Sequence, residues 1–94
     1  MDVLVRIKRL IVARRVRFTT KATEERERDG LIVEDVLESI LNANAIKKVL
    51  RSRSPRRPRS VEHLYVIESP TFTGTWVYSK GTIFYVFVSA KLAN

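Results

Sequence analysis

The chain has 94 residues, 45% of them hydrophobic, and it contains no cysteine. This length suits one domain spanning residues 1–94, and the lack of cysteine excludes a disulfide scaffold and a thiolate metal site. Eighteen Lys and Arg against ten Asp and Glu give a formal charge of +8, which favours binding to a polyanion such as RNA.

The basic residues are concentrated in two blocks that contain no acid. Seven lie between Arg6 and Lys21, and seven more lie between Lys47 and Arg59. A run of charge is often only a solvated face, but two acid-free blocks favour a surface that binds an acidic partner. No apolar run approaches the ~18 residues of a membrane span, so we expect no membrane contact and a cytoplasmic protein.

Residues 1–44 are predicted to be mainly helical. Apolar spacing and capping residues indicate, in chain order, a helix over residues 3–13 behind Asp2, a brief strand over 16–19, a short charged helix to about Arg28, and a second amphipathic helix over 33–41. Thr19 or Thr20 can cap the short helix, and Gly30 is placed to end it.

Residues 45–94 change to the period of two that is typical of strands. We predict strands over residues 45–51, 61–67, 75–79 and 83–91, with a break at Pro70–Gly74 and a tight turn at Lys80–Gly81. The proline-rich and arginine-rich segment over residues 52–60, SRSPRRPRS, is predicted to be a loop. The expected fold is α+β, with the two strong helices packed on one face of an antiparallel sheet.

The basic segment is a candidate RNA contact, although it can equally be a plain mobile linker. Its arginines, together with one residue before it and one lysine further along, are the predicted RNA-binding residues: Arg51, Arg53, Arg56, Arg57, Arg59 and Lys80. Arg51 is also a candidate basic helper in catalysis.

Most catalytic motifs are absent from the chain. The single histidine excludes a multi-histidine metal site and a two-histidine ribonuclease mechanism, and the acids cluster on predicted helices instead of strand ends. Cleavage of nucleic acid would then rely on Lys, Arg, Tyr and the one His, without a metal or cofactor. RNA suits such a site because its own 2′-OH is the nucleophile, so the protein has only to shift protons and stabilise charge.

Strand alternation groups the candidates by face. It places His63 with Tyr65 and Ile67, Trp76 with Tyr78 and Lys80, and Ser89 and Lys91 with Tyr85 and Phe87. Each has a plainer explanation: the lysines as strand-end charges, Tyr78 as a core residue, and His63 as a packed or exposed one. Four aromatic residues are predicted to be core, with base stacking as the alternative for the first of them: Trp76, Phe72, Phe84 and Phe87.

Three segments together resemble the MqsR family of toxin endoribonucleases. They are the opening RIKRLIVARRVRFTTKA, the helix DGLIVEDVLESIL with Lys47 and Lys48 after it, and the strands TGTWVYSK and VFVSAK. The resemblance extends from about Leu4 to Lys91 and rests on the order of the elements. It implies a RelE-like fold and a cytoplasmic toxin that cleaves mRNA without metal and that a cognate antitoxin holds inactive.

The resemblance also implies catalytic residues. By position, Lys48 matches the family's active-site lysine after the second long helix, Tyr78 matches the tyrosine of its V-Y-x-K strand, and Lys91 matches the lysine of its closing strand. The family's glutamine beside the first long strand has no counterpart here. His63 or Leu64 falls at that place, and His63 is a candidate for proton transfer. Two other functions stay open: a non-catalytic RNA- or ribosome-binding module, and a basic subunit whose acidic partner is a protein.

Overall fold

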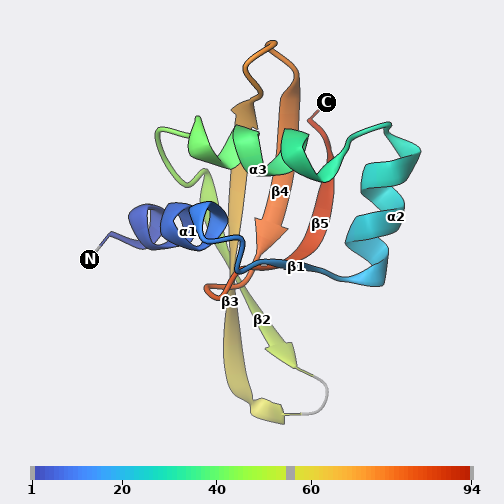
Figure 1. Ribbon diagram of the computed structural model, residues 1–94. Helices are drawn as coiled ribbons and strands as arrows, with labels where there is room; N and C mark the ends of the chain where they lie inside the picture. The colour runs from blue at the N-terminus through green and yellow to red at the C-terminus, as the bar shows by residue number, and fades with distance from the viewer. Residues whose placement is uncertain (1, 55–56, 94) are drawn as a thin grey trace.

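The computed structural model describes the backbone of residues 2–54 and 57–93, and the side chains of residues 2–51 and 62–93. Within these ranges, three helices and five strands follow one another along the chain (Figure 1). Their bounds are α1 Val3–Val12, β1 Arg17–Phe18, α2 Thr20–Arg28, α3 Val33–Leu41, β2 Lys48–Ser54, β3 Arg57–Pro70, β4 Trp76–Gly81 and β5 Val86–Leu92. The fold is therefore α+β, which confirms the predicted class.

Helix α1 forms where the apolar spacing predicts it. It begins after Asp2, whose carboxylate accepts a hydrogen bond from the backbone N–H of Leu4 at 2.8 Å. Leu4, Ile7 and Ile11 recur at intervals of three and four residues and are its buried residues. None of the described helices is long and apolar enough to cross a membrane.

The ends of α2 and α3 also follow local chemistry. Thr19 caps α2 by accepting the N–H of Ala22 at 3.2 Å, and Gly30 follows the helix with φ of +72°, the left-handed conformation that favours glycine. No polar side chain precedes α3. Instead, the carboxylate of Asp35 in its first turn accepts the N–H of Ile32 at 3.0 Å.

The strands form one sheet in the order β1-β5-β4-β3-β2. β2, β3, β4 and β5 are antiparallel neighbours, as predicted, but β1 pairs in parallel with β5. The sheet is therefore mixed, and the prediction of a purely antiparallel sheet is wrong. β1 has only two residues, and so short a segment carries no pattern that would indicate its direction.

The prediction of a loop over residues 52–60 is also wrong. β2 continues to Ser54, β3 begins at Arg57, and these two residues lie opposite each other in an antiparallel hairpin. The prediction assumed that a strand needs a packed face. This hairpin instead extends beyond β4, which pairs only with Tyr65–Pro70 of β3, and an unpaired strand edge tolerates proline and charge. Figure 1 shows the hairpin projecting away from the helices.

The turn between β4 and β5 lies later than predicted. Lys80 and Gly81 belong to β4, and β5 begins only at Val86, so the chain reverses over residues 82–85. Gly81 is needed because the ring of Tyr85 lies close to its Cα atom. A Cβ atom at Gly81 would lie 2.7 Å from the buried ring of Tyr85, nearer than side-chain atoms can pack.

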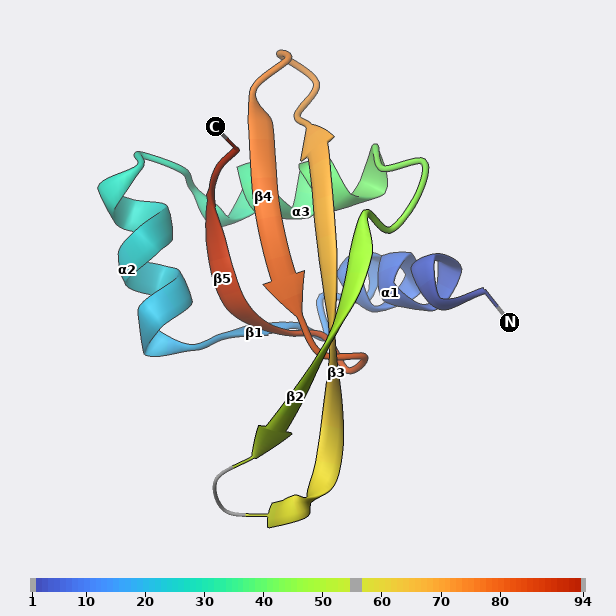
Figure 2. The ribbon, with the colours of Figure 1, turned by 180° about the vertical axis from the view of Figure 1, so that it is seen from behind.

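Helices α1 and α3 lie on one side of the sheet, and α2 lies along the edge of β5 (Figures 1 and 2). α3 packs against β3 and β4, α1 packs against α3, and α2 packs against β5. The core between the layers joins helix residues such as Ile7, Val36 and Ile40 to the strand residues Ile67 and Val77. Figure 2 shows that no described helix covers the opposite side of β3, β4 and β5, which we call the open face.

Candidate functional site on the open face

Side chains of alternate strand residues point to the open face. Ile67, Val77 and Ala90 belong to the core under the helices, so their neighbours in each strand point the other way. The pairing register then aligns the open-face residues in two rows across the sheet. One row is Lys48, Val66, Lys80 and Ser89, and the next is Glu68, Tyr78 and Lys91.

A β-bulge in β5 sets which of its residues reach this face. Lys80 lies opposite Ser89, but the next residue, Gly81, lies opposite Phe87, so Val88 is an extra residue on β5. Phe87 therefore points into the core while Ser89 and Lys91 do not. The prediction that Phe87 and Ser89 share a face is wrong, because simple alternation does not anticipate a bulge.

Tyr78 is at the centre of the second row. The ammonium group of Lys91 lies 5.3 Å from the centroid of the Tyr78 ring, within the range of a cation–π contact. On the other side, Glu68 lies opposite Tyr78, and its carboxylate accepts a hydrogen bond from the ammonium group of Lys47 at 2.7 Å. Two of the residues predicted to be catalytic, Tyr78 and Lys91, are thus in contact.

The hydroxyl of Tyr78 keeps its proton at neutral pH. Partial burial raises its pKa above the ordinary value, the carboxylates of Glu68 and Glu25 raise it further, and Lys47 opposes them only in part. A tyrosine in this state can donate a proton or a hydrogen bond but is a poor base.

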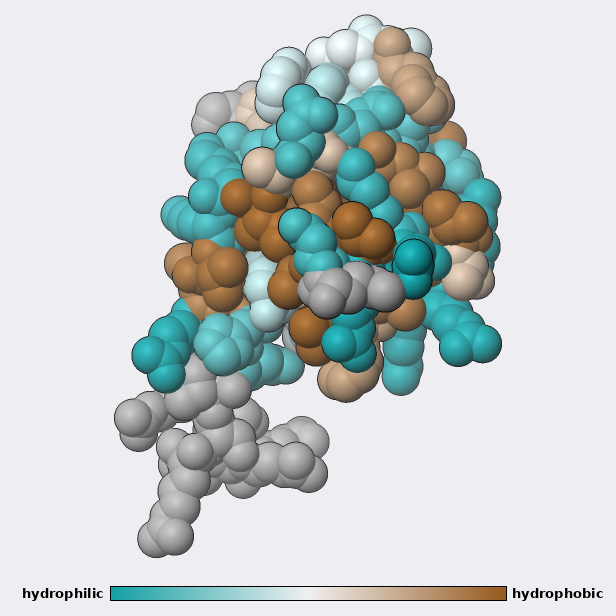
Figure 3. All heavy atoms as spheres, turned by 90° about the vertical axis from the view of Figure 1, so that its left-hand side faces the viewer, coloured by the Kyte–Doolittle hydropathy of each residue, from teal (hydrophilic) through white to brown (hydrophobic). Residues whose placement is uncertain are grey.

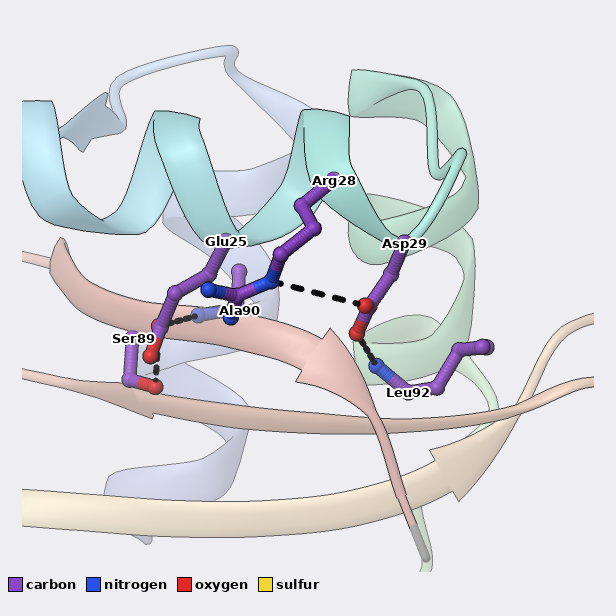
Figure 4. A network of polar contacts seen from close by, with 6 residues as sticks. All are labelled: Glu25, Arg28, Asp29, Ser89, Ala90 and Leu92. Atoms are coloured by element: carbon purple, nitrogen blue, oxygen red, sulfur yellow. Dashed lines mark hydrogen bonds and ion pairs between the residues drawn. The ribbon is translucent and has the colours of Figure 1, made fainter.

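Helix α2 holds the strand that carries Lys91. The carboxylate of Glu25, which is buried, accepts hydrogen bonds from the hydroxyl of Ser89 at 2.6 Å and from the N–H of Ala90 at 3.3 Å (Figure 4). Asp29 accepts the N–H of Leu92 at 2.9 Å. These bonds hold β5 on both sides of Lys91, at the two residues before it and at the residue after it.

Burial alone would raise the pKa of the Glu25 carboxyl. The hydrogen bonds from Ser89 and Ala90, followed by the charges of Lys21 and Lys91, outweigh that effect and hold the pKa below its ordinary value. Glu25 is therefore ionised at neutral pH, and it complements the positive charge of Lys91.

Lys48 and Lys80 belong to the first row. Both lie opposite Val66, one on each side, so their Cα atoms are two strand spacings apart, about 9–10 Å. Tyr78 is two residues from Lys80 along β4, about 7 Å further. Lys48, Lys80, Lys91 and Tyr78 thus share one face of the sheet.

His63 lies elsewhere. Together with Tyr65 and Ile67, it points to the side of the sheet that the helices cover, as strand alternation predicts, and it lines a different hollow, formed by residues of the hairpin and the β4–β5 turn. Along β3 it is five residues from Glu68, roughly 16–17 Å. Arg51, which is opposite His63, points to the same side. The structure therefore brings neither residue to the group around Tyr78.

The other hairpin arginines lie outside the described side chains. Arg53, Arg57 and Arg59 are described only in their backbone, and Arg56 lies outside the described residues. Their predicted contacts with RNA stay predictions.

Three aromatic residues that were predicted to be core are exposed. Phe72 is 78% exposed, Phe84 69% and Trp76 53%, whereas Phe87 is fully buried, as predicted. Trp76 occupies the open face two residues before Tyr78, at the rim of a hollow that Lys47 and Glu68 also line. Trp76 shares a face with Tyr78 because the two residues are two positions apart in β4. The hydrophobicity of the side chain alone predicts burial.

Two residues of the group were not predicted from the sequence. Glu68 and Lys47 are 21 positions apart in the chain, and only the pairing register brings them beside Tyr78. Among the described residues, no three His, Asp or Glu side chains are grouped so that they could hold a metal ion. In comparisons with known protein families, curated proteins and solved structures, the chain matched none.

Proposed function

We propose that the protein is a metal-independent endoribonuclease that binds single-stranded RNA on the open face. The observation that carries this proposal is the grouping of Tyr78 with Lys47, Lys80 and Lys91 on a sheet face that no described helix covers. Cationic side chains beside exposed aromatic ones suit a phosphate backbone and its unstacked bases. DNA lacks the 2′-OH on which this chemistry depends.

The proposed reaction begins at the RNA 2′-OH, whose proton passes to the carboxylate of Glu68 as the oxygen attacks the adjacent phosphorus. Lys91, Lys80 and Lys48 stabilise the negative charge that develops on the phosphate oxygens. The bond from phosphorus to the 5′-oxygen breaks, and this oxygen takes the proton of the Tyr78 hydroxyl. A 2′,3′-cyclic phosphate and a 5′-hydroxyl result, and Glu68 returns its proton to the neighbouring phenolate of Tyr78.

The test is cleavage of unstructured mRNA by the full chain in EDTA, with Tyr78→Phe as the decisive variant. The substitution keeps the ring and its contact with Lys91 but removes the proton, and we expect a loss of at least ~10-fold, since proton transfer contributes about 10²–10⁴. Tyr65→Phe is the matched control, because Tyr65 lies on the helix side. Binding without cleavage by the native chain would favour the non-catalytic RNA-binding module, and full activity of Tyr78→Phe would refute this mechanism.

We further propose that the protein is a cytoplasmic toxin with a RelE-like fold, neutralised by a cognate antitoxin that docks on the outer side of α1. This side carries Val5 and Val12, which are 43% and 71% exposed, around a hollow that Arg9 also lines. Figure 3, which looks onto the left-hand side of Figure 1 and so onto the N-terminal end of α1, shows hydrophobic surface among hydrophilic surface.

The charge of this surface favours an acidic amphipathic helix of the antitoxin as its occupant. Arg6, Arg9 and Arg15 surround a second hollow along the same helix, and none of the ion pairs in the described part of the chain includes them. A partner with acids beside apolar residues would match both features, whereas RNA would leave the valines uncovered.

Co-expression with the product of a neighbouring acidic reading frame tests this partner. We expect Val12→Asp to prevent co-purification, because it places a charge in the apolar stripe. Val49→Asp should leave the complex intact, because Val49 is exposed on β2 and lines neither of the two hollows along α1. A complex that tolerates Val12→Asp as well as Val49→Asp would exclude α1 as the docking surface.

A further inference from the structure

The side chain of Trp76 is unusual in its position. It is the only tryptophan of the chain, it is 53% exposed, and it lies on a sheet face whose other prominent side chains are polar or cationic. A large aromatic residue gains most from burial, so a sheet that leaves it half exposed leaves apolar area for something else to cover.

The hollow beside Trp76 has the size of a small-ligand site. Its volume is ≈ 470 Å³, within the ~300–1,000 Å³ that such sites occupy. Its walls are the connection between α3 and β2, the end of β3, and Trp76 itself: Asn42, Asn44, Ala45, Lys47, Glu68, Ser69, Pro70 and Trp76.

Hydrogen bonds hold the connection in place. The side-chain amide of Asn42 donates to the carbonyl of Pro70 at 3.0 Å, and the ammonium group of Lys8 donates to the carbonyl of Ala43 at 2.6 Å. The N–H of Lys47 donates to the carbonyl of Val66 at 2.8 Å. The wall opposite Trp76 is therefore fixed to both α1 and β3, so little ordering is needed when a ligand enters.

We infer that this hollow binds one unpaired nucleobase, which stacks on the indole of Trp76 and presents its edge to Asn44. An indole ring offers a flat surface on which any base can stack. Asn44 is exposed at the rim, and its amide carries both donors and an acceptor, the groups that distinguish the edges of the bases. The inference rests on the proposed function and deepens it, because it assigns the subsite next to the reacting phosphate.

The distances along the strand support this assignment. Trp76 is two residues from Tyr78, about 7 Å, which matches the step between neighbouring nucleotides of an extended strand. Lys47 lines the hollow and also forms an ion pair with Glu68 beside Tyr78. The same ammonium group therefore lies next to both the hollow and the group around Tyr78. A base in the hollow would place its own phosphate near Lys91 and Tyr78.

The experiment uses the intrinsic fluorescence of the single tryptophan. The probes are 2′-O-methyl oligoribonucleotides, which lack the attacking hydroxyl and stay intact, and an abasic oligomer with the same number of phosphates. We expect base-bearing oligomers to quench the fluorescence and the abasic oligomer to leave it unchanged. Equal quenching by both would overturn the inference, because it would indicate a response to phosphates alone.

A binding series with matched variants completes the test. Trp76→Ala should weaken binding of the base-bearing oligomers about 5- to 150-fold, the range for removing the aromatic partner of one stacked base. Phe84→Ala, which removes a still more exposed aromatic ring in the β4–β5 turn, should have no effect. Asn44→Ala should change the order of preference among the four bases. Equal affinities of Trp76→Ala and Phe84→Ala would overturn the inference.

The outcomes separate the inference from the proposed function. Quenching and base preference in a chain that does not cleave RNA would remove the ribonuclease and keep the base site. Cleavage with unaltered rate and base preference in Trp76→Ala would keep the ribonuclease and remove the base site.

Discussion

Replacing Glu25 by alanine should lower the free energy of unfolding substantially. The carboxylate of Glu25 accepts hydrogen bonds at 2.6 Å from Ser89 and at 3.3 Å from the N–H of Ala90, and both donors lie in buried surroundings. A hydrogen bond to a charged group contributes about 1.5–3 kcal/mol, and the longer one contributes less. We expect a loss of roughly 2–4 kcal/mol in the free energy of unfolding.

Urea unfolding followed by circular dichroism measures this loss. A domain of this size is typically stable by about 5–15 kcal/mol, so the variant should still fold, with Tm lower by roughly 10 °C or more. Glu24→Ala is the matched control, because Glu24 is the neighbour on the same helix and lies outside the buried network, so this change should alter stability by less than about 0.5 kcal/mol. A destabilisation of Glu25→Ala no larger than that of the control would refute this role of Glu25.

Two further predictions concern charge. Folding lowers the pKa of Glu25, so its stabilising contribution is present above the unfolded pKa of about 4.3 and is lost as the pH falls through the folded pKa. As the pH decreases below about 4.5, the stability of Glu25→Gln should therefore fall less steeply than that of the native chain. Urea titrations at a series of pH values measure this difference. Neutralising hairpin arginines should flatten the salt dependence of RNA binding by roughly 0.7 in slope for each phosphate that the hairpin no longer binds, and an unchanged slope would show that the hairpin binds none.

The helices could be predicted from the sequence because their signals are local. Asp2 and Thr19 cap the helices that follow them, and Gly30 ends α2 as its position suggested. The apolar period of α3 predicted its bounds to the residue. Each of these features depends on atoms within about one helical turn, so no knowledge of the rest of the fold is required.

The sheet was harder to predict, because its details depend on residues that are distant in the chain. The bulge at Val88 separates Phe87 from Ser89 although they are two residues apart. Hydrophobicity placed Trp76 in the core, yet the helices cover only the other face of the sheet. The proximity of Glu68 to Lys47 depends on the pairing register of the strands, which a period of two does not determine.

The two margins of the sheet differ in whether they can be extended. At one margin, β5 pairs with the two-residue strand β1, and two of its backbone N–H groups donate to Glu25 and Asp29. At the other margin, β2 pairs with β3, and no described strand lies on its other side. The β5 side therefore offers an incoming strand only the two residues of β1, whereas β2 has seven residues. A second copy that extends this sheet would pair along β2, because the longer margin forms more backbone hydrogen bonds.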